Sequence, residues 1–438
     1  MQKMRKMKDS GIEWIGEIPE GWEVAKLKNI VSIVRGGSPR PIEAYMSDND
    51  NDVNWIRISD TEKGSKYITH TSRKLIASGI SKSRFIKRGS LILTNSMSFG
   101  EPYILDIDGC IHDGWVAFSD FKKIDKEFLY YFLTSPLAKI QFEQQVDGGV
   151  VKNLNIDKIG DTVILLPSLI DQNKVIAHLD SLTSETNSLL SKTITSIEEY
   201  KKLKQAVITQ AVTKGVRGER EMKDSGVEWI GEIPAEWSIT KIKSGVTKIG
   251  SGKTPSGGAE TYTDSGVIFL RSQNIYDCTL NLESPTYISP EVDATMKSTR
   301  VLPDDVLLNI TGGSIGRCSI VPKTLGLANV NQHVCIIRTN PLIFLPKYMQ
   351  YFWVSTLGHL AIDLYQTGGN REGMSADAIR NTPIPYAPLN EQKEIADYLD
   401  AKCAEIDKLI AKKEQLVKEL ESYKKSLIYE VVTGKREV

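Results

Sequence analysis

One phrase occurs twice in this chain, half its length apart. MKDSGIEWIGEIPEGW occupies 7–22 and MKDSGVEWIGEIPAEW occupies 222–237, with 13 of 16 positions identical at an offset of 215 residues. A second alignment, at an offset of 220, places KEFLYYFLTSPLAKI (126–140) over PKYMQYFWVSTLGHL (346–360). A repeat that spans a 438-residue chain predicts two copies of one structural unit rather than one large core.

Each copy ends in a long polar stretch in which apolar residues recur at steps of three and four. They are Val175, Leu179, Leu189, Ile197, Tyr200, Leu203, Val207 and Ile208 in the first copy, and Ile395, Leu399, Leu409, Val417, Leu420, Tyr423, Leu427 and Ile428 in the second. The spacing predicts an amphipathic helix of about 43 residues, roughly 64 Å long, with a narrow apolar stripe. Because so narrow a stripe needs a partner, we expect the two helices to form an antiparallel coiled coil within the chain.

These patterns together predict an α+β fold with circular pseudo-two-fold symmetry. The C-terminal TGKREV resembles TKGVRGE at 213–219, after which the first copy continues into the second, so that the end of the chain could lead into its beginning. The expected order is a mixed α/β domain at 1–168, a long helix at 169–215, a second mixed domain at 216–388 and a second long helix at 389–438.

Between the shared phrase and the shared helix, the two copies have diverged but keep five polar, glycine-rich loops in register. The matching segments are 34–41 with 248–258, 53–60 with 267–274, 91–104 with 306–320, 111–118 with 329–337, and 145–153 with 366–374. One such loop is typical of a plain surface turn. Five that recur in two otherwise divergent domains favour a common binding face, where Arg, Lys, Asn, Gln and Ser could reach phosphates and base edges.

Composition limits the other possibilities. The 55 basic residues balance 55 acidic ones, so the chain as a whole shows no general attraction to nucleic acid. Five scattered cysteines without a CxxC pattern favour reduced thiols in the cytoplasm, and neither they nor the five histidines show metal-ligand spacing. We expect no membrane span and no signal peptide, because the apolar runs are too short.

Two segments imitate catalytic motifs. GSGKT (250–254) resembles a phosphate-binding loop, but Thr247 stands where that pattern requires glycine. NTPIPY (381–386) resembles the Asn-Pro-Pro-Tyr loop of adenine methyltransferases, but its prolines are interrupted. With no nucleophile–base pair or paired carboxylates either, we expect no catalysis by this chain itself.

The doubled MKDSG(I/V)EWIGEIP, the GSGKTP loop, and the Asp-Gln or Glu-Gln pair that opens a long helix ending in TKG resemble the specificity subunit of a type I restriction–modification system. The resemblance covers essentially the full chain. It implies that each diverged segment is a target-recognition domain, reading one half of a bipartite, asymmetric sequence in double-stranded DNA. It also implies that the helices are a spacer that docks two methyltransferase subunits, which restriction (motor-nuclease) subunits join. The partners, rather than this non-catalytic chain, would bind S-adenosylmethionine, ATP and Mg²⁺.

Position in the loops nominates the DNA-binding residues under this resemblance. They are Ser38, Arg40, Arg57, Ser59, Asn95, Ser98, Lys152 and Asn153 in the first domain, and Lys253, Thr254, Arg271, Gln273, Asn274, Ser314, Arg317, Asn331, Gln332, Asn370 and Arg371 in the second. Arg can bridge guanine O6 and N7, and Asn or Gln can pair with adenine. Arg57 and Arg271 follow strands, so a salt bridge at the edge of the core is a competing role for each.

Other readings stay open at this level. The repeated phrase could fasten each domain to a helix through Trp14 and Trp229, or meet a partner through its acidic edge, which consists of Glu13, Glu17, Glu228 and Glu232. The whole chain could instead be a stand-alone nucleic-acid-modifying enzyme, or a coiled-coil scaffold with no role on DNA.

Overall fold

The computed structural model describes residues 6–62, 64–96, 99–145, 154–366 and 373–438. The chain forms two compact units, one made of 1–194 with 414–438 and the other of 195–413. Each unit therefore contains a mixed domain, the start of its own long helix and the end of the other long helix. Within the described residues, no helix is long and apolar enough to cross a membrane.

The first domain is built around two five-stranded sheets, ordered β4-β13-β10-β11-β7 and β5-β8-β6-β12-β9. Its strands are β1 (Met7–Asp9), β2 (Glu17–Pro19), β3 (Glu23–Lys26), β4 (Ser32–Arg35), β5 (Met46–Ser47), β6 (Val53–Ile56), β7 (Tyr67–Ile68), β8 (Lys74–Leu75), β9 (Arg84–Ile86), β10 (Leu91–Thr94), β11 (Pro102–Leu105), β12 (Gly109–Ile111), β13 (Trp115–Ser119) and β14 (Val163–Leu166). Its helices are α1 (Leu27–Ile30), α2 (Ala77–Ile80), α3 (Lys126–Thr134), α4 (Pro136–Gln145) and α5 (Ile156–Asp161). The repeated phrase forms the hairpin β1–β2.

The second domain repeats this plan with two four-stranded sheets, ordered β18-β27-β24-β25 and β19-β23-β20-β26. Its strands are β15 (Met222–Asp224), β16 (Glu232–Pro234), β17 (Ser238–Lys241), β18 (Val246–Ser251), β19 (Tyr262–Thr263), β20 (Val267–Leu270), β21 (Ile275–Tyr276), β22 (Thr279–Leu280), β23 (Thr286–Ile288), β24 (Val306–Asn309), β25 (Cys318–Ile320), β26 (Ala328–Val330), β27 (Val334–Thr339) and β28 (Pro383–Tyr386). Its helices are α7 (Pro290–Thr295), α8 (Pro346–Val354), α9 (Thr356–Tyr365) and α10 (Ala376–Asn381). Equivalent strands are therefore arranged in the same order in the sheets of both domains, although the two sequences have diverged.

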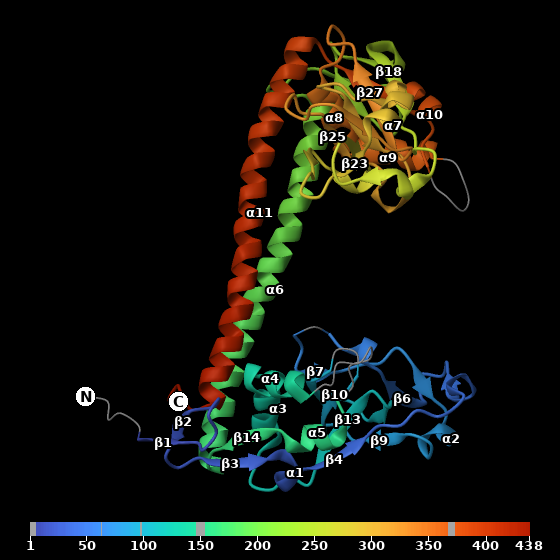
Figure 1. Ribbon diagram of the computed structural model, residues 1–438. Helices are drawn as coiled ribbons and strands as arrows, with labels where there is room; N and C mark the ends of the chain where they lie inside the picture. Colours follow the sequence, from blue (N-terminus) through green and yellow to red (C-terminus); the bar gives the residue numbers. More distant parts are fainter. Residues whose placement is uncertain (1–5, 63, 97–98, 146–153, 367–372) are drawn as a thin grey trace. The chain divides into compact units, whose positions relative to one another are not determined.

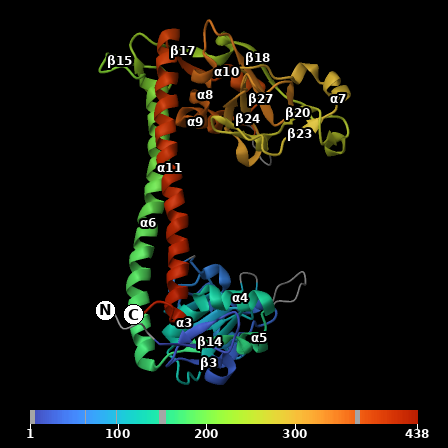
Figure 2. The same cartoon turned by 60° about the vertical axis from the view of Figure 1, so that its left-hand side comes forward.

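Each domain is followed by one long helix, α6 (Leu169–Lys214) or α11 (Leu389–Val432), and Figures 1 and 2 show the two side by side. In the second unit Lys204 Nζ lies 2.7 Å from Asp407 Oδ1, and Lys413 lies over the Tyr200 ring, so the segments run antiparallel. In the first unit Lys424 donates to Asn187. The predicted α+β fold, with a long helix after each domain and the helices packed together, is confirmed.

The apolar stripe differs from the prediction in both long helices. Leu189 and Leu203 of α6 and Tyr423 of α11 were expected in the stripe but are exposed, whereas Thr183, Thr186 and Thr193 of α6 are buried. Each threonine hydroxyl donates to the carbonyl four residues earlier, at 2.6–2.7 Å, so a small polar side chain fits there with its hydrogen bond satisfied. Counting only apolar residues therefore misplaced the stripe.

The largest apolar cluster in each unit joins the domain to both helices. In the first unit, Phe128 and Phe132 of α3 share a cluster with Leu179 of α6 and with Leu427 and Val431 of α11. In the second unit, an equivalent cluster combines α8 and α9 with the end of α6 and the start of α11. Burial of these side chains stabilises a domain against the helices.

A buried glutamine in the first turn of each long helix holds the domain through its side-chain amide. Gln172 accepts from the Asp125 N–H at 2.8 Å and donates to the carbonyls of Lys123 and Pro167, both at 2.9 Å. Gln392 accepts from the Leu345 N–H at 2.9 Å and donates to two carbonyls, those of Ile343 and Ala387. Each side chain is 0% exposed, so the same three-bond anchor fixes both domains to their helices.

A tyrosine–aspartate contact supports each anchor two turns further along the helix. Tyr131 of α3 donates to Asp180 of α6, and Tyr351 of α8 donates to Asp400 of α11 at 2.7 Å. Burial raises the pKa of both phenols, which keeps them protonated as donors. A lysine completes each site, but from different places: Lys66, next to β7, in the first unit and Lys347 of α8 in the second.

Replacing Gln172 by Met should test the anchor, because Met keeps the approximate shape but removes the side-chain partner of three backbone groups. We expect a loss of about 2–4 kcal/mol in the free energy of unfolding of the first unit, measured by urea denaturation. Gln415→Met is the matched control, because Gln415 is exposed on α11 and its side chain donates to Glu419 on the same helix. Equal stability of the two variants would contradict the anchoring role.

Candidate DNA interface

In the first domain, one short loop binds three others. The loop 112–114 follows β12, and its Asp113 carboxylate accepts from Ser38 Oγ at 2.7 Å. His112 Nε2 lies 3.3 Å from the Ile58 N–H, and the Gly114 carbonyl accepts from the Asn95 N–H at 3.0 Å. The loops after β4, β6 and β10 are therefore gathered around 112–114, which we call the hub loop.

Electrostatics reinforces this arrangement. Burial lowers the pKa of the His112 imidazole and outweighs the nearby Asp113 carboxylate, which favours the neutral ring that can accept from Ile58. The hydrogen bond from Ser38 is the main cause of a lowered pKa at Asp113. An ionised Asp113 thus lies 3.7 Å from Arg40, whose side chain is 84% exposed.

The second domain has the same hub loop at 331–333, after β26. The Asn331 N–H donates to the Leu270 carbonyl at 3.0 Å, and the Ile310 N–H donates to the His333 carbonyl at 3.0 Å. The Lys253 N–H bonds to Val330 at the end of β26. The loops after β18 and β24 and the last residue of β20 therefore meet around the end of β26 and the loop that follows it, although the side chains at these positions differ from those in the first domain.

A glycine allows the closest approach in each domain. A Cβ on Gly36 would lie 2.1 Å from the His112 carbonyl oxygen, and a Cβ on Gly252 would lie 2.0 Å from that of Val330. Both distances are far shorter than van der Waals contact, so only glycine lets the loops after β4 and β18 reach the hub loops.

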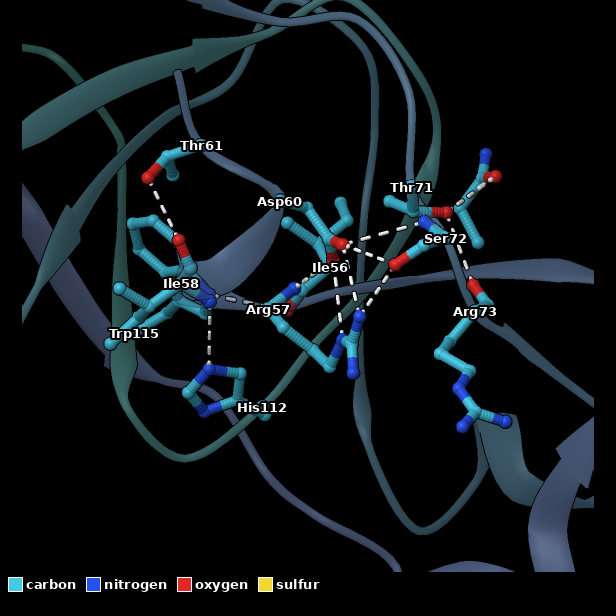
Figure 3. Close-up of polar contacts among 11 residues, drawn as sticks. Ile56, Arg57, Ile58, Asp60, Thr61, Thr71, Ser72, Arg73, His112 and Trp115 are labelled. Atoms are coloured by element: carbon cyan, nitrogen blue, oxygen red, sulfur yellow. Dashed lines mark hydrogen bonds and ion pairs between the residues drawn. The ribbon is translucent and has the colours of Figure 1, made fainter. Parts of the chain in front are cut away.

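Arg57 and Arg271 end equivalent strands, β6 and β20, but their surroundings differ. Arg57 Nη2 lies 3.2 Å from the buried carboxylate of Asp60, and Figure 3 shows its guanidinium beside Asp60 and Ser72. Arg271 makes no ion pair among the described residues, its Nε is buried without a hydrogen-bond partner, and its guanidinium stacks over Tyr262 at 5.6 Å. The salt bridge considered from the sequence is therefore present at Arg57, while Arg271 is charged and uncompensated.

The remaining described candidates differ in exposure. Exposed ones are Arg40, Ser59, Lys253, Thr254, Gln273 and Gln332, while Ser38, Ser314 and Arg317 are half-buried. Arg317 lies over the Tyr276 ring at 4.7 Å, and Ser314 Oγ accepts from Asn309.

Asn95, Asn274 and Asn331 are buried. Asn274 caps the Arg271 N–H and donates to Asn281, and Asn331 accepts from the His333 N–H. These two amides are occupied within the chain, where they shape the loops.

Five candidates lie outside the described residues: Ser98, Lys152, Asn153, Asn370 and Arg371. The chain re-enters the described part close to the same loops in both domains. Leu154 donates its N–H to the Asn95 carbonyl, and Met374 donates its N–H to the Ile310 carbonyl, each at 2.9 Å.

The structure also adds residues that the loop alignment missed. Exposed Arg73 follows Ser72, whose hydroxyl donates to Asp60 at 2.8 Å, so the chain at Arg73 passes close to the turn that holds Arg57 (Figure 3). Ser83 Oγ donates to the Gly37 carbonyl at 2.7 Å, which places Lys82 and Arg84 next to the loop after β4. The signal was present in the sequence, because 73–88 contains six basic residues and no acidic one.

Both segments that imitate catalytic motifs have ordinary structural roles. Lys253 and Thr254 precede a single 3-10 turn, Gly258–Thr261, rather than a phosphate-binding helix. NTPIPY spans the end of α10 and strand β28, which pairs with β17. Among the described residues, no group of three or more His, Cys, Asp or Glu side chains could hold a metal ion.

Replacing Gly252 by Ala should displace the loop after β18, because the new methyl group meets backbone rather than a flexible side chain. We expect a loss of about 1–3 kcal/mol in the free energy of unfolding of the second unit. Faster hydrogen exchange at the Lys253 and Asn331 amides should accompany it. Gly250→Ala is the control, because no atom lies within 4 Å of its added Cβ, and similar behaviour of both variants would refute the close approach.

Comparison with known proteins agrees with this duplicated architecture. The description "Type I restriction modification DNA specificity domain" matches residues 19–199 and again 234–419. The chain is 24% identical to the type I restriction enzyme MjaVIII specificity subunit of Methanocaldococcus jannaschii, covering 95% of this chain and 93% of that one. It is 26% identical to the EcoBI specificity subunit of Escherichia coli over 62% of this chain and 58% of the relative.

Solved structures show the same fold. A chain from work on "complex assembly and conformational transition of the type I R-M system" superimposes with a TM-score of 0.73 at 16% identity, covering 96% of this chain and 99% of that chain. The HsdS subunit from Thermoanaerobacter tengcongensis gives a TM-score of 0.50 at 16% identity, with 96% of this chain and 98% of that one covered. The family's domain matches the chain twice, and the two matches together cover most of the chain. The chain therefore belongs to the specificity subunits of type I restriction–modification systems.

Proposed function

We propose that this chain reads a bipartite, asymmetric target in double-stranded DNA, one half-site per domain, and directs adenine methylation and restriction that its partner subunits carry out. The observation that carries the proposal is the hub loop, which holds three polar loops in the first domain and contacts the loops after β18 and β24 in the second. Two similar backbone scaffolds that carry different side chains are suited to reading two different base sequences in the same way.

The exposure and pairing of each side chain suggest its part in reading. Arg271 and Arg317, held over aromatic rings, and the exposed Gln273 and Gln332 are the base-reading candidates of the second domain. In the first domain the candidates are Arg57, Ser38 and Ser59. Arg40, Arg73, Lys82 and Arg84 suit phosphates, which supply affinity without sequence information.

The partners follow from the family and from the repeat. Two alike hairpin-and-helix surfaces suit one kind of partner bound twice, so we propose two methyltransferase subunits on the helices, with restriction subunits added to that core. S-adenosylmethionine, ATP and Mg²⁺ then belong to those subunits. Domain boundaries at 168, 215 and 388 fit this division, because they separate reading domains from docking helices.

Mapping methylated adenines in the host genome, with the gene present and deleted, tests the proposal. We expect a bipartite motif that disappears on deletion.

The variant Arg271→Ala, mapped in the same way, tests the reading role of this side chain. It should relax or weaken recognition in one half-site only, by about 1–3 kcal/mol for the base that it contacts. Lys323→Ala, which removes a highly exposed charge from the same domain, is the control. Survival of every motif after deletion would refute the function, and equal loss over both half-sites would make Arg271 a fold residue.

Helix length should set the spacing between the half-sites. A helical insertion of four residues lengthens a helix by about 6 Å, close to two base-pair steps of about 3.4 Å. We expect an insertion after exposed Ser191 of α6, with a matching insertion in α11, to shift the mapped motif to a longer spacer. Four Ala substitutions at neighbouring exposed positions, which leave the length unchanged, should preserve the spacing. An unchanged spacer in the insertion variant would contradict the proposal.

A further inference from the structure

The turn after β6 contains a buried carboxylate that does more than cap it. Asp60, in the single turn Ile58–Asp60, accepts from the Arg57 backbone N–H at 2.9 Å, from Arg57 Nη2 at 3.2 Å and from Ser72 Oγ at 2.8 Å. Its side chain is only 3% exposed. Burial acts to raise the pKa of this carboxyl, but the hydrogen bonds from Arg57 and Ser72 outweigh it, so the pKa lies below its usual value.

These contacts use one edge of the Arg57 guanidinium. Asp60 and Ser72 engage Nη2, and Nε lies 3.5 Å from the Asp60 carboxylate. Nη1 makes no hydrogen bond among the described residues, and a third of the Arg57 side chain is exposed. Figure 3 shows the contacts converging on the side of the guanidinium that faces Asp60. Nη1 therefore keeps its N–H donors for an acceptor outside the chain.

The second domain shows that the turn itself needs no negative charge. Asn274 takes the place of Asp60 and accepts from the Arg271 N–H at the same 2.9 Å, while its amide nitrogen donates to the Asn281 carbonyl. The two turns match, yet no carboxylate in the described part of the chain pairs with Arg271, whose Nε has no hydrogen-bond partner there. A neutral amide is therefore a sufficient cap, and the charge of Asp60 has a different purpose.

We propose that Asp60 is a positioning residue for DNA reading by the first domain, holding the Arg57 guanidinium so that Nη1 is free to donate to an acceptor on one base edge, such as O6 or N7 of guanine. This inference rests on the proposed function and deepens it. A guanidinium that is held in advance cannot turn to suit another base, so the contact favours discrimination. The carboxylate also cancels the charge of Arg57 toward phosphates, which lowers binding that ignores sequence.

The test uses the full chain in complex with its methyltransferase partner and duplexes carrying every single substitution in the mapped half-sites. Asp60→Asn keeps an acceptor for the Arg57 N–H but removes the charge that holds the guanidinium. We expect discrimination to fall roughly tenfold at one base position of one half-site. We also expect tighter binding to unrelated DNA at low salt. In an Arg57→Ala background, Asp60→Asn should have no further effect on discrimination.

Two further variants separate positioning from folding. Asp106→Asn removes a carboxylate that pairs with Arg88 in the same domain, and it should leave discrimination unchanged. Ser72→Ala changes an exposed residue without changing charge, and it should cause a smaller loss at the same base position as Asp60→Asn. Unchanged discrimination in Asp60→Asn, or equal weakening over both half-sites, would overturn the inference while leaving the proposed function intact. A parent complex without any sequence preference would overturn both.

Discussion

A side-chain amide buried in the first turn of each long helix, Gln172 or Gln392, is the interaction on which the rest of the structure depends. Each closes three hydrogen bonds to backbone groups of the preceding domain through a side chain that is itself fully buried. Because the partners are backbone groups, the domain's side chains can change freely without weakening the anchor. The domain sequences are accordingly free to diverge while the junction stays constant.

A related combination of backbone and side-chain contacts occurs at the face that we propose for DNA reading. The hub loops 112–114 and 331–333 bond to their neighbours through peptide groups, and 112–114 also uses the side chains of His112 and Asp113. Gly36 and Gly252 allow contacts that any side chain would block. The face can therefore present Ser38, Arg57 and Arg40 in one domain and Thr254, Arg271 and Gln332 in the other. A scaffold of this kind can change its target through substitutions of loop side chains, while the apolar core stays the same.

The contrast between Arg57 and Arg271 shows how far equivalent positions can differ. One guanidinium is held by a buried carboxylate, and the other lies against an aromatic ring with a nitrogen unpaired. Both turns are closed by the same hydrogen bond, from the arginine N–H to the side-chain oxygen of the residue three positions later, so the difference resides in the side-chain charge at Asp60 and Asn274. The two domains therefore share their architecture while differing in the way an arginine is presented.

The sequence was sufficient to predict the duplicated α+β fold, the two long helices and the family, because repeats and helical periodicity are local patterns. It placed Leu189 and Leu203 wrongly, because buried threonines that bond to their own helix do not look apolar. It could not reveal that Asn274 is occupied by Asn281, or that Ser72 supports Asp60, because these contacts join segments separated in the chain. The solvent exposure of a side chain also depends on the fold. Exposed Arg73 was therefore missed, whereas buried Asn95 was named as a DNA-binding candidate.

Hydrogen–deuterium exchange of the complex with its methyltransferase partner, with and without duplex DNA, tests most directly whether each hub loop organises one reading face. With a duplex in which one half-site has been scrambled, the account predicts protection of 36–40, 57–60 and 112–114, or of 252–254, 271–274 and 331–333, but not of both sets. Protection confined to other parts of both domains, or equal protection of both sets with either half-site scrambled, would contradict it.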